Sequence, residues 1–249
     1  MDIELQQRFI DLWQKYFNNA ELPITCFFSE GDGRAEEAPK PKGHSCVICD
    51  LAKVRGGRSL YFNFKNLGCG GAKRYFGYMK EMAPTFRYFL SCGLEGKVEG
   101  ERYKRTPEMV DKWQEQQVLL PADGRNLVFK RWDKLTVEDE PEVVIFFVKP
   151  EVLSGLFTLA NFDQVDPNGG VMTPFGAGCG TIVHHPWLER GKEYPRCTIG
   201  MFDPSARPCV PADVLTFAAP FERFVQLVDY MEESFLITDT WDKVKERIE

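Results

Sequence analysis

The sequence predicts an α+β or α/β fold: a single domain over residues 1–249, built on a mixed β-sheet with flanking helices. Amphipathic helical patterns alternate along the chain with short strand-like runs, and the run at 143–148 is continuously apolar, as a central strand would be. With 249 residues, of which 43% are hydrophobic and 27% charged, the chain is long enough to bury a large core.

The expected helices follow from apolar spacing and from residues that favour helix ends. Residues 3–17 place Phe9, Leu12 and Trp13 at helical intervals. Thr106 is a good N-cap and Pro107 a good first helical residue, so a helix is expected from there to about residue 120. Further helices are expected over residues 46–54, 84–92, 150–162, 219–235 and 240–249.

Strands are expected over residues 23–28, 58–64, 126–132, 142–148 and 196–201. The chain also shows a weak internal similarity, because a strand at 24 and a strand at 143 are each followed, after an interval, by a Gly-Cys-Gly triplet. This similarity predicts two half-units, 20–125 and 126–236, although chance or convergent loop chemistry explains the short matches as well.

Charge and hydropathy exclude several classes of protein. The net charge of −6 is unfavourable for binding nucleic acid, which needs a basic surface. The longest apolar run, 143–148, is too short to span a membrane, and the start of the chain lacks an apolar signal region. The sequence therefore predicts a cytoplasmic protein whose partner is a small molecule or a redox protein, and it leaves the oligomeric state open.

The eight cysteines suggest a metal site, catalysis or core packing, because nothing indicates secretion. Cys46 and Cys49 have the two-residue gap of metal-binding pairs, and Cys69 lies among glycines whose backbone N–H groups can face sulfur. Irregular spacing suits an iron–sulfur cluster better than zinc, with Cys179 or Cys92 as a fourth ligand or with none. Core packing and redox thiols remain the alternatives.

The stretch 174–187, PFGAGCGTIVHHPW, holds a second group of candidates. Gly178 and Gly180 flank Cys179, and their conformational freedom suggests a loop that wraps closely around a ligand. His184 is a candidate proton donor or ligand near this loop; alternatively it and the next histidine cap carbonyl groups at a helix end, since Pro186 ends any helix there. His44, close to Cys46, has the same ambiguity.

Arg207 lies in a turn-rich loop after an expected strand. Its guanidinium is suited to a carboxylate or phosphate, and the alternative is an ion pair with Asp203 that braces the loop. Two functions follow: an iron–sulfur or metal protein with a redox role, or a metal-free protein that binds an anionic small molecule through glycine-rich loops and Arg207. A cysteine hydrolase that pairs Cys179 with His184 or His185 is a third.

Several motifs together resemble a known family. These are Cys46 followed by Ala52 and Gly56, and the segments LGCGGAKRYFG, PEVLSGLFTLANFD, PFGAGCGTIV and CTIGMFDPSAR. Over about residues 20–236 the chain is similar to the uncharacterised bacterial and archaeal group called domain of unknown function 169. The resemblance implies that Cys46, Cys69, Cys179 and Arg207 stand at recurring motif positions, which it does not imply for Cys49. We expect Cys46, Cys69 and Cys179 to surround one cavity.

Overall fold

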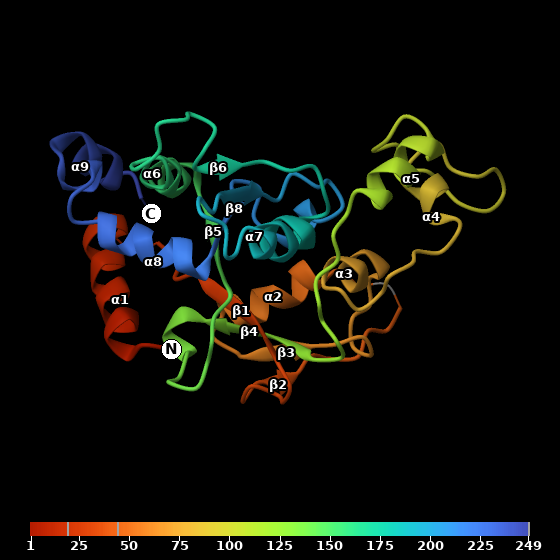
Figure 1. Ribbon diagram of the computed structural model, residues 1–249, viewed down its shortest axis with the longest axis horizontal. Helices are drawn as coiled ribbons and strands as arrows, with labels where there is room; N and C mark the ends of the chain where they lie inside the picture. The colour runs from red at the N-terminus through yellow and green to blue at the C-terminus, as the bar shows by residue number, and fades with distance from the viewer. Residues whose placement is uncertain (19, 44, 249) are drawn as a thin grey trace.

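The structure, a computed structural model, describes residues 1–18, 20–43 and 45–248. Eight strands of these residues form one mixed sheet in the order β2-β3-β4-β1-β5-β8-β7-β6, with helices on both faces (Figure 1). This confirms the predicted single α+β domain. The strands are β1 (Ile24–Ser29), β2 (Glu36–Glu37), β3 (Leu60–Phe62), β4 (Asn126–Arg131), β5 (Val143–Val148), β6 (Val171–Met172), β7 (Cys197–Gly200) and β8 (Leu215–Pro220).

The helices connect and cover these strands. The α-helices are α1 (Ile3–Phe17), α2 (Val47–Arg55), α3 (Gly70–Tyr75), α4 (Phe86–Phe89), α5 (Pro107–Glu115), α6 (Pro150–Ala160), α7 (His185–Leu188), α8 (Phe221–Tyr230) and α9 (Asp239–Lys245). A π-helix, Gly180–His184, runs directly into α7. Short 3-10 helices are Trp132–Lys134, Arg207–Cys209 and Phe235–Ile237. No helix of the described residues has the length and apolar character needed to cross a membrane.

The sheet is symmetric in its strand order. β1 and β5 pair antiparallel at the centre, and each has its antiparallel partner, β4 or β8, on its outer side. Beyond these, β3 and β7 are antiparallel to β4 and β8, and the edge strands β2 and β6 are parallel to β3 and β7. Strand order therefore divides the sheet between β1 and β5, into one unit of residues 24–131 and another of residues 143–220.

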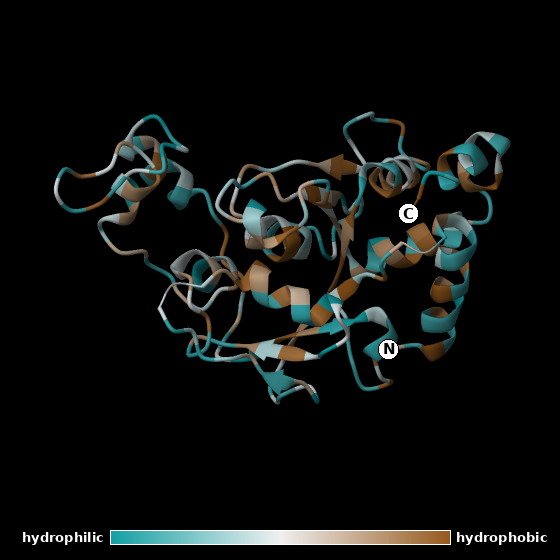
Figure 2. Ribbon diagram, turned by 180° about the vertical axis from the view of Figure 1, so that it is seen from behind, coloured by the Kyte–Doolittle hydropathy of each residue, from teal (hydrophilic) through white to brown (hydrophobic). Residues whose placement is uncertain are grey.

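Both faces of the sheet are buried, so alternate residues of the central strands enter two different cores. Val143, Ile145 and Phe147 of β5 pack with α2, α3 and the π-helix. Val144 and Phe146, which point the other way, pack with α1, α6, α8 and α9. Covering both faces explains why β5 is apolar throughout. Figure 2 shows the helices with hydrophobic and hydrophilic segments side by side, as this arrangement requires.

Some expected elements differ in extent. The helix expected over 84–92 is limited to Phe86–Phe89, and the one from Pro107 ends at Glu115. The strand β8 was not expected, and residues 219 and 220, expected to be helical, belong to it. Its two alanines have weak strand propensity, but pairing with β5 along its full length overrides that preference.

The segment between α3 and β4 makes a lobe of largely irregular chain. Its helices α4 and α5 lie at the end of the molecule opposite α1 and α9 (Figure 1). Arg74 of α3 binds this lobe, because its guanidinium donates to the side chain of Gln117 and to the carbonyls of Lys80 and Gln114. The lobe is therefore attached to the helix that follows Cys69.

Candidate cysteine site

Three free cysteines lie at the start of three different helices. Cys46 and Cys69 directly precede α2 and α3 with extended backbone, whereas Cys179 already has helical backbone and leads into the π-helix. Cys46 and Cys69 are half-buried against the core, and Cys179 is buried within it. None of the three side chains caps its helix with a hydrogen bond.

The three thiols lie within range of one another's charge. Burial raises the pKa of Cys179 well above its ordinary value, and the thiols of Cys69 and Cys46 raise it further. Burial also raises the pKa of Cys46; the backbone N–H of Ile48 acts against this, and Cys69 adds to it. All three cysteines also lie in or against the same hydrophobic core.

Asp203 joins this neighbourhood from the loop after β7. Its carboxylate accepts hydrogen bonds from the backbone N–H of Gly178 at 3.2 Å and from both the N–H and the hydroxyl of Ser205. Its charge also contributes to the raised pKa values of Cys46 and Cys179. Asp203 therefore fixes the Cys179 loop and adds a negative charge near the thiols.

Gly178 and Gly180 are required for packing. A Cβ atom on Gly180 would lie 2.7 Å from the ring of Tyr75, and one on Gly178 would lie 2.9 Å from the Cβ of Ala206. The Tyr75 hydroxyl accepts a hydrogen bond from Ala177 at 3.5 Å, so this ring lies directly over the Cys179 loop. The glycines thus let Tyr75 and the loop after β7 approach Cys179 closely.

Cys49 does not join the other candidate ligands. It forms a disulfide with Cys209, with 4.7 Å between the two Cα atoms. The interpretation of Cys49 as a metal ligand is corrected by this bond, because its sulfur is already used. The physical reason is its place in α2: Cys46 precedes the helix, whereas Cys49 lies within its first turn and faces the 3-10 helix Arg207–Cys209.

His184 lies in the core. Its ring is 2% exposed, contacts the ring of Tyr75, and hydrogen-bonds through Nε2 to the carbonyl of Val118. Burial lowers the pKa of His184 below its ordinary value. Pro186 does not end the helix, because it lies in the first turn of α7, where a missing N–H costs little. His44 lies outside the described residues.

Arg207 is used by its own loop. Its guanidinium donates to the carbonyls of Pro211, Ala212 and Val214. The loop is therefore braced by backbone carbonyls rather than by an ion pair between Arg207 and Asp203, whose carboxylate accepts hydrogen bonds from Gly178 and Ser205. These bonds use three of the five N–H donors that the guanidinium could offer to an anionic ligand.

No three histidine, cysteine, aspartate or glutamate side chains of the described residues are arranged closely enough to hold a single metal ion. Cys92, the other candidate fourth ligand, is exposed, and its thiol contacts Ser91 and the carbonyl of Gly93. The signal that sequence reasoning missed is Asp203, which follows a strand within a turn-rich loop, as Cys69 does.

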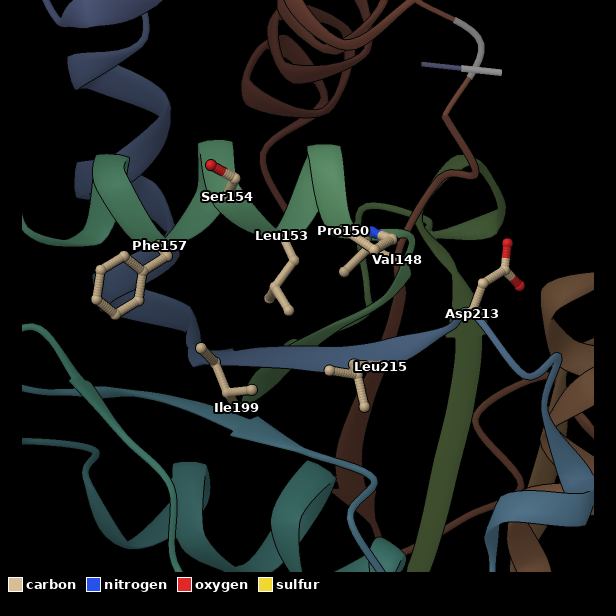
Figure 3. A pocket seen from close by; sticks show the side chains of 8 residues that line it. All are labelled: Val148, Pro150, Leu153, Ser154, Phe157, Ile199, Asp213 and Leu215. Carbon is tan, nitrogen blue, oxygen red and sulfur yellow. The ribbon is translucent and has the colours of Figure 1, made fainter. Parts of the chain in front are cut away.

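Two cavities lie elsewhere. One, about 320 Å³, is lined mainly by apolar side chains of α6 and strands β5, β7 and β8, with Leu153, Phe157 and Ile199 around it (Figure 3). The second, about 310 Å³, adjoins it through Val148 and Asp213. Neither is lined by a cysteine, so neither is the cavity expected around Cys46, Cys69 and Cys179.

Residues 17–230 match the model of one protein family, domain of unknown function 169, described as "Uncharacterised ArCR". The chain belongs to this family. The suggested resemblance is thereby confirmed, and the match includes every cysteine of the candidate site. No curated protein and no solved structure matches this member of the DUF169 family.

Proposed function

We propose that this DUF169 protein binds an iron–sulfur cluster through Cys46, Cys69 and Cys179 and has a redox role. The observation that carries the proposal is that three free thiols from distant parts of the chain, each at the start of a helix, lie in or against one core. Burial and the neighbouring thiols raise the pKa of Cys179, so this thiol is protonated when no metal is bound. Bound iron would displace the proton, because a metal stabilises the thiolate form.

The donor set suits a cluster better than a single ion. Thiolates are soft ligands, which select iron–sulfur clusters, zinc or copper(I). Structural zinc needs four ligands around one point, and the described residues offer no such group. A cluster holds several metal atoms, so its cysteine ligands can stand further apart. When bound, it would supply one-electron chemistry, or a coordination position for a small molecule at an iron that lacks a cysteine.

The chain's own residues would define the surroundings of such a cluster. Tyr75 and the glycines beside Cys179 close the site on its buried side, and Asp203 holds the Cys179 loop in position. Cys46 and Cys179 precede helices in corresponding places of the symmetric sheet, between β2 and β3 and between β6 and β7. The proposal therefore includes two related half-units that share one site.

The proposal also includes a reducing, cytoplasmic location. Six cysteines of the described residues are free, which is typical of proteins from reducing compartments, and the Cys49–Cys209 disulfide would there be a redox-active bond rather than a structural one. A metal-free site for an anionic small molecule is less well supported, since the guanidinium of Arg207 already binds three carbonyls.

Anaerobic purification tests the proposal. The wild-type protein should be brown, contain iron and labile sulfide, and show a charge-transfer absorption that bleaches on reduction. Cys69→Ala and Cys179→Ala should each abolish cluster loading, whereas Cys92→Ala, a matched control at an exposed thiol, should not. A colourless protein after reconstitution with iron and sulfide, or full loading of both variants, would overturn the proposal.

A further inference from the structure

The disulfide between Cys49 and Cys209 connects two elements that belong to different units of the sheet. Cys49 lies in α2, and Cys209 ends the 3-10 helix after β7, 160 residues further along the chain. Cys49 is an exposed residue and Cys209 is half-buried. A thiol in solution can therefore approach this bond from the side of Cys49.

A free thiol lies beside this disulfide within the same helical turn. Cys46 precedes α2, and its carbonyl accepts a hydrogen bond from the N–H of Cys49 at 3.1 Å, which closes the first turn of the helix. This bond places Cys46 and Cys49 one turn apart at the start of α2, where residues three apart are neighbours.

This combination is that of a thiol–disulfide exchange site. In a Cys-X-X-Cys pair at the start of a helix, the first cysteine is the attacking thiol and the second its partner. Cys46 and Cys49 have this spacing at the start of α2, which is nine residues long. Cys69 and Cys179 precede other helices and lack a second cysteine at this spacing.

We infer that Cys46, Cys49 and Cys209 form a thiol–disulfide exchange site whose substrates are dithiols or disulfides of a redox partner. In the internal step the Cys46 thiolate attacks the Cys49 sulfur, the Cys49–Cys209 bond breaks, and a Cys46–Cys49 bond forms. Cys209 leaves as a thiolate and takes up the proton that Cys46 has lost. This internal step leaves the number of electrons unchanged. Exchange with an external dithiol or disulfide changes the oxidation state of the three cysteines by two electrons.

The exchange separates the two units at this point. Once Cys209 is released, the only covalent bond between α2 and the Arg207–Cys209 turn among the described residues is gone. One consequence rests on the proposed function: with Cys46 in a disulfide, a cluster loses one of its three ligands. Oxidation of Cys46 to this disulfide would then oppose cluster binding.

Metal-free protein tests the exchange separately from the cluster. Wild-type protein and the variants Cys209→Ser, Cys46→Ser and Cys92→Ser are equilibrated in glutathione buffers of graded ratio, quenched with an alkylating reagent and mapped by peptide mass spectrometry. Wild-type molecules in which Cys209 is alkylated should have a Cys46 that is not alkylated, because it is bonded to Cys49. In Cys209→Ser, a Cys46–Cys49 disulfide should form, and in Cys46→Ser only Cys49–Cys209 should be found.

The inference fails if Cys46 and Cys49 of the Cys209→Ser protein are both fully alkylated at glutathione ratios where wild-type protein keeps its Cys49–Cys209 bond. It also fails if Cys46 of wild-type protein is alkylated in every molecule that has released Cys209. The wild-type measurement keeps the test valid should Cys209→Ser fail to fold, and Cys92→Ser should behave as wild type. Iron is absent throughout, so neither result depends on cluster binding.

Discussion

Lys130 and Asp139 form an ion pair inside the protein, with the Lys130 Nζ 2.8 Å from both carboxylate oxygens and side chains only 2% and 5% exposed. Asp139 also accepts hydrogen bonds from the N–H and the hydroxyl of Thr136, so its oxygens are well satisfied. The pair connects strand β4 to the segment of chain that leads from β4 into β5.

Removing one partner of this pair should strongly destabilise the protein. We expect Asp139→Asn to lower the free energy of unfolding by about 3–5 kcal/mol, because the Lys130 ammonium is left buried without a counter-ion. The double variant Lys130→Met with Asp139→Asn should recover most of the loss, since no charge is then buried. Urea denaturation measures each value.

An exposed pair is the control for this experiment. Arg8 and Asp229 lie 2.7 Å apart with side chains 45% and 53% exposed, so Asp229→Asn should cost less than about 1 kcal/mol. Equal losses from Asp139→Asn and Asp229→Asn would contradict the assignment of Lys130 and Asp139 as a buried pair.

Substitutions at the glycines beside Cys179 should disturb the site while the fold remains. The Cβ of Gly178→Val would lie 2.9 Å from the Cβ of Ala206 and 3.2 Å from the sulfur of Met201, so the loop must shift. Overpacking of this kind costs about 1–3 kcal/mol. We expect an unchanged far-ultraviolet circular dichroism spectrum, a single unfolding transition at lower denaturant and faster alkylation of Cys179.

Gly31→Ala is the matched control. Because nothing lies within 4 Å of a Cβ at Gly31, the stability of this variant should be nearly unchanged. Global unfolding of Gly178→Val would show that the loop is needed for the whole fold rather than for the site.

His185 should make stability depend on pH in the acid range. Burial and the nearby His184 lower the pKa of His185 to about 4, from an ordinary value of 6.5. Between these two values the unfolded chain binds a proton that the folded protein does not bind. The free energy of unfolding should therefore fall as the pH drops from 6.5 to 4, by about 2 kcal/mol after allowance for the partial exposure of the ring.

His185→Phe should reduce this dependence, because the ring contact with Tyr75 remains while one titrating group is lost. The part that remains comes from His184, whose pKa burial also lowers. Urea midpoints at pH 7, 6, 5 and 4 measure the effect. If wild-type protein and His185→Phe lose stability in parallel over this range, His185 is not the titrating group.

Asp163 should make stability depend on pH at lower values. Its carboxylate accepts hydrogen bonds from the Arg223 guanidinium at 2.6 and 2.7 Å and from the Tyr230 hydroxyl, and the Arg223 bonds hold the pKa of Asp163 well below its ordinary value of 3.8. The stabilisation that these bonds give is complete at pH values above the ordinary pKa of Asp163. It is lost as the pH falls toward the lower pKa that Asp163 has in the folded protein. Asp163→Asn should lower stability at pH 7 and flatten its decline below pH 4.

The decline below pH 4 can be followed by thermal unfolding at pH 4, 3 and 2. A decline of equal steepness in wild-type protein and Asp163→Asn would assign the acid lability to other carboxylates.

Local sequence was enough to predict the fold class and the elements with strong patterns. The helix of residues 3–17 and the strand at 143–148 were placed within a residue or two, because apolar periodicity and a continuous apolar run are local properties. Strand β8 was missed because two alanines weaken its local pattern, and only its pairing with β5 makes it a strand. Tertiary pairing outweighed intrinsic preference there.

The sequence by itself determined which residue types were available for a site: cysteines, of which Cys69 and Cys179 each stand between two glycines. Only the tertiary structure decided their partners. It bonded Cys49 to Cys209, turned Arg207 onto its own loop, buried His184 beneath Tyr75, and brought Asp203 to the loop of Cys179. Local pattern cannot fix these outcomes, because each depends on contacts between segments far apart in the chain, which form only when the sheet assembles.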